Sequence, residues 1–223
     1  MTYRYKRISI IGYSLLLIIT SSLMTVLCYH LFVFNTFKSD DNQTLPFREI
    51  SAAQVANSPI TEENSIIEVM SYGCHYCAAN EENLSNFAKE LPAGYKFKSI
   101  HIADDDNGLA AFASVFATLE EMGIEEKMRD SAYNAVITRG INISNEKALE
   151  DWLKKNNISV SDYKHAHDSN AVKQRLRKMA EITKFYNINA TPMFIINKRY
   201  VVAQDRDFPE FAQRMMQLLE KDK

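Results

Sequence analysis

The sequence predicts an α/β domain with an all-helical insertion, preceded by one N-terminal transmembrane helix. Three observations support this class: an uncharged run near the N-terminus, β-like segments on both sides of the middle of the chain, and helical periodicity through residues 108–187. A chain of 223 residues is long enough for one such domain. Its 26 basic and 28 acidic residues nearly balance, so we expect no nucleic-acid partner.

The N-terminal segment has the length of a membrane-spanning helix. The run Ile8–Phe34 contains no Asp, Glu, Lys or Arg over about 27 residues, and about 20 apolar residues suffice to cross a bilayer. Basic residues precede the run, so residues 1–34 are interpreted as a cytoplasmic tip and a single-pass anchor in the cytoplasmic membrane. A long cleaved signal peptide is the alternative. Both interpretations place the globular part in the periplasm or outside the cell, after a linker over residues 35–60.

Two cysteines, Cys74 and Cys77, lie in the exported part and form a single C-x-x-C; Cys28 lies in the apolar run. A scaffold held by disulfides would need more cysteines, spread along the chain. A tetrahedral zinc site would need two further ligands, and no second C-x-x-C or H-x-x-x-H supplies them. We therefore expect a working dithiol with no metal and no other cofactor, and a static structural disulfide is the alternative.

The residues around the C-x-x-C predict a strand, a turn and a helix. The apolar run Ile66–Met70 is typical of a buried strand, and good helix formers recur over Ala78–Glu90. This order places Cys74 at a helix N-terminus, where free amide N–H groups and the helix macrodipole stabilise a thiolate. The thiolate is the attacking species in disulfide exchange, so Cys74 is the expected nucleophile. Cys77 lies further into the helix and is expected to resolve the mixed disulfide.

The segments beyond this helix follow the βαβ…ββα order of a thioredoxin fold. We expect its first half over residues 61–107 and its second half over 188–223, with the helical insertion between them. Thr191-Pro192 directly precedes a strand of the second half, a position where a proline need not donate to a ladder. The expected elements are strands Tyr95–Ile102, Met193–Asn197 and Tyr200–Ala203, and a closing amphipathic helix over 207–221.

Together these features resemble the DsbA family, the thioredoxin-fold thiol-disulfide oxidoreductases of the bacterial cell envelope. The resemblance covers most of residues 60–221 and rests on the C-x-x-C helix, the helical insertion, the Thr-Pro and the closing ββα. It implies that Cys74 is the nucleophile and Cys77 the resolving cysteine. It also implies that Pro192 is a cis-proline and that Thr191 contacts bound peptide.

Two further residues follow from the resemblance. Glu68 lies six residues before Cys74, where the family has a buried acid that helps proton transfer at the dithiol. Lys98 matches a lysine that pairs with that acid. Between the cysteines, however, His75 and Tyr76 replace the Pro-His that is usual in the family. We expect this dipeptide to tune the redox potential, because a histidinium beside the dithiol favours the thiolate.

The function implied by the resemblance is the introduction of disulfide bonds into exported proteins. The expected partners are exported protein thiols and a DsbB-like membrane oxidase that re-oxidises the pair, and we expect a monomer. A membrane-tethered reductase or isomerase, for example in cytochrome maturation, is the alternative function. A third possibility is a non-catalytic binding module in which the cysteines form a static disulfide.

Overall fold

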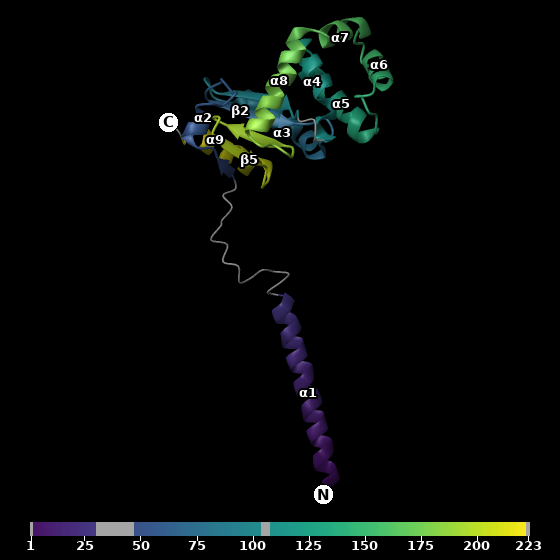
Figure 1. The fold of residues 1–223 in the computed structure, drawn as a ribbon, viewed down its shortest axis with the longest axis vertical. Helices are drawn as coiled ribbons and strands as arrows, with labels where there is room; N and C mark the ends of the chain where they lie inside the picture. The colour runs from purple at the N-terminus through teal and green to yellow at the C-terminus, as the bar shows by residue number, and fades with distance from the viewer. Residues whose placement is uncertain (1, 30–46, 104–107, 222–223) are drawn as a thin grey trace. The chain divides into compact units, whose positions relative to one another are not determined.

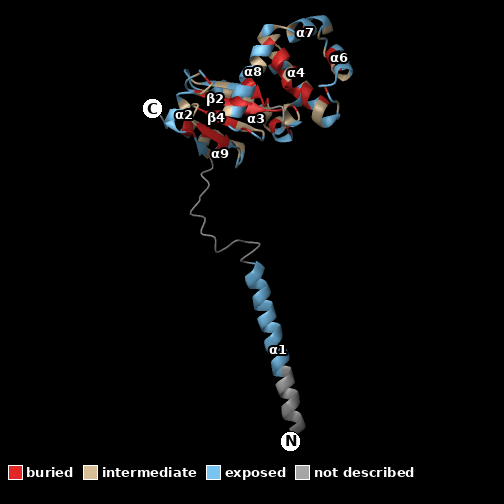
Figure 2. Ribbon diagram, in the orientation of Figure 1, coloured by how far each residue is buried: buried red, intermediate tan, exposed pale blue. Residues whose placement is uncertain are grey.

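A computed structural model describes residues 2–29, 47–103 and 108–221 of the chain, without the side chains of residues 2–11 (Figure 1). The chain divides into two units, Met1–Leu45 and Pro46–Lys223, and each is treated by itself. The first unit contains the helix α1, Thr2–Cys28. From Gly12 onward the described side chains of α1 are exposed (Figure 2).

None of the helices in the described part of the chain is both long and apolar enough to cross a membrane. This finding does not support the transmembrane anchor predicted over Ile8–Phe34. Residues 30–34 of that prediction lie outside the described residues, as do residues 35–46 of the predicted linker.

The second part of the predicted linker belongs to the folded unit. Phe47–Glu49 forms the short strand β1, and Ala52–Val55 forms the helical turn α2, which Ser51 caps. The side chain of Phe47 packs edge-to-face on Tyr200, with ring centroids 5.5 Å apart. Residues 35–60 are therefore not a linker throughout, because this aromatic contact and antiparallel pairing with the strand β5 hold β1 on the sheet.

Five strands form one mixed sheet in the order β1-β5-β4-β2-β3. The strand β2, Ser65–Met70, lies between β4 and β3 and is buried along its whole length, as its apolar sequence predicts (Figure 2). It pairs in parallel with β3, Lys96–His101, and antiparallel with β4, Met193–Ile196. β4 continues through a tight turn into β5, Tyr200–Ala203.

Two helices, α3 and α9, cover one face of this sheet. α3 spans His75–Glu90 and makes the crossover between the parallel strands β2 and β3, and α9 spans Phe208–Glu220. Their apolar sides bury a cluster against β2, β4 and β5 that includes Leu84, Phe194 and Phe211. The thioredoxin-like core predicted from the sequence is therefore present.

The other large group of helices lies between the two halves of the sheet in sequence and gathers on one side of it (Figure 1). Together with residues of β2 and β3, these helices bury a second core that includes Phe116, Tyr133 and Trp152. The elements are η2 Gly108–Phe112, α4 Ala113–Glu121, α5 Glu125–Tyr133, the π-helical turn η3 Asn134–Thr138, α6 Glu146–Lys155, α7 Val160–His167 and α8 Asn170–Phe185.

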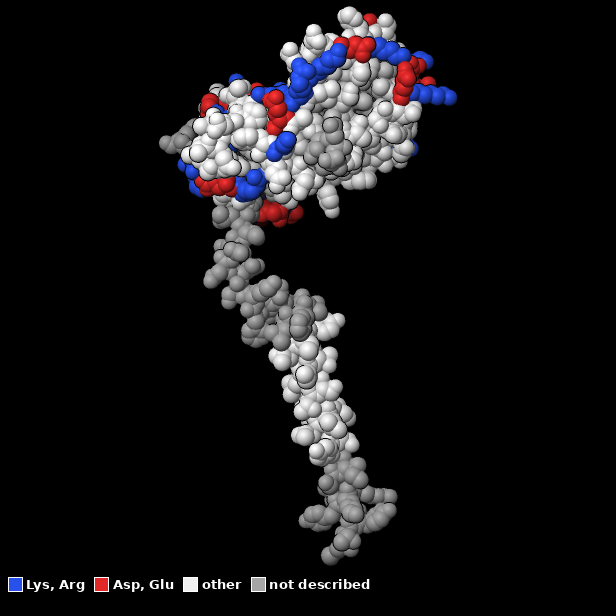
Figure 3. Space-filling view, in the orientation of Figure 1, with Lys and Arg blue, Asp and Glu red and all other residues white. Residues whose placement is uncertain are grey.

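On the face of this unit that Figure 3 shows, basic and acidic side chains are interspersed rather than gathered by sign. Large areas of the face in view carry neither charge. This distribution agrees with the nearly balanced composition of the chain, which has a formal net charge of −2.

Candidate active site

Cys74 and Cys77 form a disulfide at the start of α3. The chain leaves β2 at Met70 and turns sharply, with the Cys74 N–H donating to the Ser71 carbonyl over 2.9 Å. Cys74 has extended backbone geometry and is the N-cap of α3, so the helix begins at His75 and Cys74 lies at its N-terminus, as the sequence predicts. Cys77 lies one turn into the helix, which brings the two Cα atoms to 5.2 Å.

The two sulfur atoms differ in their surroundings. Cys74 retains 5 % of its surface and Cys77 is fully buried. The backbone N–H of Cys77 donates to the Sγ of Cys74 over 3.0 Å. The first amides of a helix have no partner within the helix, and they carry partial positive charge. This arrangement stabilises negative charge on the Cys74 sulfur and leaves Cys74 as the more accessible of the two.

The dipeptide between the cysteines points to solvent. His75 is exposed, and Tyr76 has 76 % of its surface exposed, which is unusual for a large aromatic side chain. Both residues lie on the first turn of α3, directly after Cys74. They are therefore available to a molecule that approaches Cys74.

Thr191 and Pro192 lie at the same end of the sheet as the disulfide. Met193, the first residue of β4, is in register with Val69 near the end of β2. Because the two strands are antiparallel, the segment before β4 lies beside the segment that leads from β2 to Cys74. The Thr191-Pro192 peptide bond is cis. The Oγ1 of Thr191 is buried and has no hydrogen-bond partner among the described residues.

Glu68 lies on β2 and is fully buried. Its Oε2 accepts a hydrogen bond of 2.7 Å from Ser99, its register partner on β3. Its Oε1 has no partner among the residues that the structure describes. Desolvation raises the pKa of Glu68 to about 7, against the hydrogen bond from Ser99, which lowers it. A carboxyl group with this pKa exchanges a proton near neutral pH.

Lys98 does not pair with Glu68, so this part of the expectation is wrong. Ser99 is the residue in register with Glu68, and successive side chains of a strand point to opposite faces. Lys98 is therefore directed away from the acid. It forms an ion pair of 3.5 Å with Glu120 on α4.

The cation nearest to this acid comes instead from the helical insertion. Arg129 on α5 donates from Nη1 to the Oγ of Ser99 over 3.2 Å and to Glu81 over 3.0 Å. Its Nε also donates to Glu125 over 3.0 Å, and its Nη2 forms a short ion pair with the same carboxylate. The i,i+4 spacing of Glu125 and Arg129 signals an ion pair in the sequence. Nothing in the sequence indicates that Arg129 contacts Ser99 of β3.

Two hydrogen bonds hold Tyr72, which lies in the turn before Cys74. The hydroxyl of Tyr72 donates to Glu125 over 2.9 Å. The N–H of Tyr72 donates to Nε2 of His101 over 3.2 Å. Burial lowers the pKa of His101 to about 4, so this imidazole is neutral near pH 7 and its Nε2 can accept. Neither contact is predicted from the sequence.

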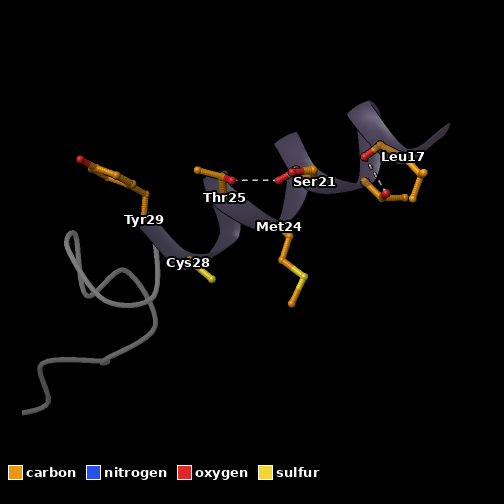
Figure 4. Close-up of a pocket in the computed structure, with 7 residues that line it drawn as sticks. Leu17, Ser21, Met24, Thr25, Cys28 and Tyr29 are labelled. Atoms are coloured by element: carbon orange, nitrogen blue, oxygen red, sulfur yellow. Dashed lines mark hydrogen bonds between the residues drawn. The ribbon is translucent and has the colours of Figure 1, made fainter. Parts of the chain in front are cut away.

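Other hollows lie outside this site. One of about 660 Å³ runs along α1, lined by residues that include Ser21, Thr25 and Cys28 (Figure 4). The hydroxyl of Thr25 donates to the Ser21 carbonyl within the helix over 2.9 Å. Within the described ranges, no three His, Cys, Asp or Glu side chains are grouped to hold a metal ion.

The fold and part of the sequence have known relatives. The thiol:disulfide interchange protein DsbA of Pseudomonas syringae pv. tomato is 27% identical over 135 residues, which cover 60% of this chain and 63% of that protein. The protein of the same name from Azotobacter vinelandii is 25% identical over 136 residues, covering 60% and 63%. The chain thus spans somewhat less than two thirds of the length of these relatives.

Solved structures show the same fold. The crystal structure of Pseudomonas aeruginosa DsbA matches with a TM-score of 0.70 and 21% identity over 79% of this chain and 92% of that one. The oxidoreductase NmDsbA1 from N. meningitidis matches with a TM-score of 0.64 and 21% identity, over 73% and 84%. The family model of the DSBA-like thioredoxin domain matches residues 95–216, more than half of the chain. The chain therefore belongs to the DSBA-like thioredoxin domain family.

Proposed function

We propose that this protein is a thiol-disulfide oxidoreductase that introduces disulfide bonds into exported proteins through the pair Cys74-Cys77. The observation that carries this proposal is the disulfide at the N-terminus of α3, with Cys74 5 % exposed and Cys77 fully buried. A helix N-terminus stabilises the Cys74 thiolate, so Cys74 is a good leaving group and the disulfide a good oxidant. The curated relatives carry the name thiol:disulfide interchange protein, which agrees with this chemistry.

The reaction proceeds in two exchanges. A substrate thiolate attacks the Sγ of Cys74, the Cys74-Cys77 bond breaks, and Cys77 leaves with the electron pair. A second substrate thiolate then attacks the substrate sulfur of the mixed disulfide, and Cys74 leaves as a thiolate. Two substrate thiols lose two electrons and two protons. The enzyme pair gains both electrons, Cys77 gains one proton, and the other proton goes to solvent while Cys74 remains a thiolate.

Glu68 is assigned the proton transfer that accompanies these steps. Cys77 leaves in a fully buried position, where a thiolate is poorly solvated and has to gain a proton. Glu68 sits on β2, the strand that leads to the dithiol, and its pKa of about 7 suits it to give and take a proton at neutral pH. The same carboxyl can accept the proton when the pair is oxidised again.

The substrate is proposed to lie across the surface formed by Thr191, Pro192 and the exposed dipeptide. The register of β4 on β2 brings the first two residues beside the Cys74 turn. His75 and Tyr76 are exposed on the first turn of α3. His75 is assigned the further role of tuning the potential, because its cationic form favours a thiolate nearby.

The proposed location is the periplasm or the outer side of the cytoplasmic membrane, where disulfides persist. The proposed partners are exported protein thiols and a DsbB-like membrane oxidase that restores the disulfide. A membrane anchor over residues 8–34 is a separate proposal, which rests on the uncharged run alone. Alkaline carbonate extraction of membranes tests it, because an integral anchor stays with the membrane pellet and a peripheral protein does not.

The test of the function is a complementation experiment with single-cysteine variants in a strain that lacks its own disulfide oxidase. Wild type is expected to restore disulfide formation in an exported reporter protein, and Cys74→Ser is expected to abolish it. Restoration by Cys74→Ser would contradict the proposal. Trapping thiols with a bulky alkylating reagent then separates the alternatives, because an oxidase is mostly oxidised in cells and a reductase mostly reduced.

A further inference from the structure

Arg129 connects the helical insertion to the strand that carries the buried acid. It lies on α5 and is only 9% exposed, and its guanidinium reaches the Oγ of Ser99 on β3. Ser99 in turn donates to Glu68 over 2.7 Å. The hydroxyl therefore accepts from the cation and donates to the carboxylate, which transmits the charge of Arg129 to Glu68 through one intervening group.

A second connection runs from Arg129 to the turn before Cys74. Arg129 holds the carboxylate of Glu125 through both Nε and Nη2. Glu125 accepts the hydroxyl of Tyr72, which lies two residues before Cys74. The ring of Tyr72 also packs edge-to-face on Tyr133 of α5, with centroids 5.9 Å apart. Tyr72, in the turn before Cys74, is therefore held against α5 of the insertion by a hydrogen bond and a ring contact.

The charges around Glu68 show why a cation is needed there. The carboxyl groups of Glu68, Glu81 and Glu125 lie near one another, and the negative charge of each raises the pKa of the others. Arg129 supplies the opposing positive charge, and its electrostatic influence lowers the pKa of Glu68. The titratable, charged and polar groups that act on Glu68 from the packed elements are Ser99 of β3, Glu81 of α3, and Glu125, Arg129 and Tyr133 of α5.

Solvent reaches the hydrogen-bonded groups around Arg129 through a groove that neither Cys74 nor Cys77 lines. A groove of about 590 Å³ between α3 and α5 is lined by Glu81, Ser99, Glu125 and Arg129, among others. Glu68 itself does not line the groove and is fully buried. The network therefore stands between the buried acid and water.

We propose that Arg129 is a positioning residue of the redox site, acting on Glu68 through Ser99 and on the Cys74 turn through Glu125. Its cation keeps the buried carboxyl able to ionise near neutral pH. This inference rests on the proposed function, because it assigns Glu68 to proton transfer at the dithiol. It gives the helical insertion a part in the chemistry in addition to its part in the fold.

The test is a titration of the Glu68 side-chain carboxyl by carbon NMR in the full-length oxidised protein, with Glu68→Gln identifying the signal. Wild type is expected to show an inflection near pH 7. Arg129→Met should move it upward by about 1 unit or more, because the opposing charge is lost. Arg129→Gln, which keeps a hydrogen-bonding amide, should move it likewise, and it carries the test if the Met variant does not fold. Arg129→Lys should restore the inflection to near the wild-type value.

The matched control is Arg175→Met. Arg175 also belongs to the insertion and pairs with two carboxylates, Glu120 and Glu121, but it lies on α8 outside the network. Its variant should leave the Glu68 inflection in place. An unmoved inflection in the neutral Arg129 variants, or an equal shift in Arg175→Met, would overturn the inference. Exchange of the wild-type disulfide with glutathione is measured separately, so a failure of the proposed function is distinguished from a failure of the role of Arg129.

Discussion

The backbone N–H of Cys77 donates to the Sγ of Cys74 over 3.0 Å, so the structure aims a helix amide at the sulfur that is to act as nucleophile. This contact depends on the backbone of α3 and not on a neighbouring side chain. It is available to the disulfide and to the reduced thiolate alike. The charged form of reduced Cys74 gains most from it, because a hydrogen bond to an ionised acceptor is about twice as strong as one to a neutral acceptor.

The reduced protein is therefore expected to alkylate first at Cys74. In a brief treatment with iodoacetamide at pH 7, mass spectrometry of peptides should find the label on Cys74 before Cys77, because Cys77 is fully buried and Cys74 lies at the helix N-terminus. Guanidinium-unfolded protein is the control, in which the two cysteines should react at similar rates. Preferential labelling of Cys77 in the folded protein would reverse the assigned roles.

Glu68→Gln is expected to change how stability depends on pH. The pKa of Glu68 is raised from 4.5 to about 7 in the folded protein, so between these values the folded chain binds more protons than the unfolded chain. Stability from this group is fully present below pH 4.5 and is lost as pH rises to about 7. The loss amounts to about 3 kcal/mol of unfolding free energy, which the glutamine variant should not show.

Denaturant unfolding of the oxidised protein at pH 4.5 and pH 8 measures this difference. Wild type should lose about 3 kcal/mol more than Glu68→Gln between the two conditions. The pKa of Glu81 is also raised, chiefly by burial, and its contribution has the same sign in both proteins, so the comparison removes it. Parallel stability curves for the two proteins would show that Glu68 does not titrate in this range.

Arg129→Met is expected to destabilise the folded protein strongly. The change leaves Glu125 and Glu81 without their buried partner, and breaking a buried ion pair from one side typically costs about 3–5 kcal/mol. Arg175→Met removes a pair near the surface and should cost about 1 kcal/mol or less. Equal midpoints of urea unfolding for these two variants would contradict the view that the Arg129 network is a buried one.

His75→Ala is expected to make the protein a weaker oxidant. A cationic histidine near the helix N-terminus stabilises the reduced thiolate, and loss of an exposed charge of this kind should lower the redox potential by roughly 10–20 mV. His165→Ala, at an exposed histidine on α7, is the control and should leave the potential unchanged. An unchanged potential in His75→Ala would contradict this role of His75.

Much of the fold could be predicted because local patterns and packing agree. The apolar β2, the C-x-x-C at a helix start and the closing ββα each follow from hydrophobic periodicity and turn residues. β1 could not be predicted, because Phe47–Glu49 is too short to show alternation. Its place on the sheet depends on pairing with β5, more than 150 residues further along the chain.

The candidate site divides in the same way. The positions of Cys74 and Cys77 follow from a spacing of three residues, which the helix itself converts into proximity. The pairing of Lys98 with Glu68 that the resemblance implies is wrong, because a shift of one residue in strand register moves a side chain to the other face of the sheet. The place of Arg129 in the site could not be predicted, because its contact with Ser99 arises from the packing of α5 on β3, and no local sequence pattern encodes that packing.

The most direct test of the central claim is a redox titration of the purified full-length protein against glutathione buffers, with the fraction oxidised read from thiol trapping. The account predicts a potential near −120 mV, the value typical of a pair whose reduced form is stabilised and which donates its disulfide to substrates. A potential near −270 mV would contradict it, because a pair of that kind donates electrons and acts as a reductant.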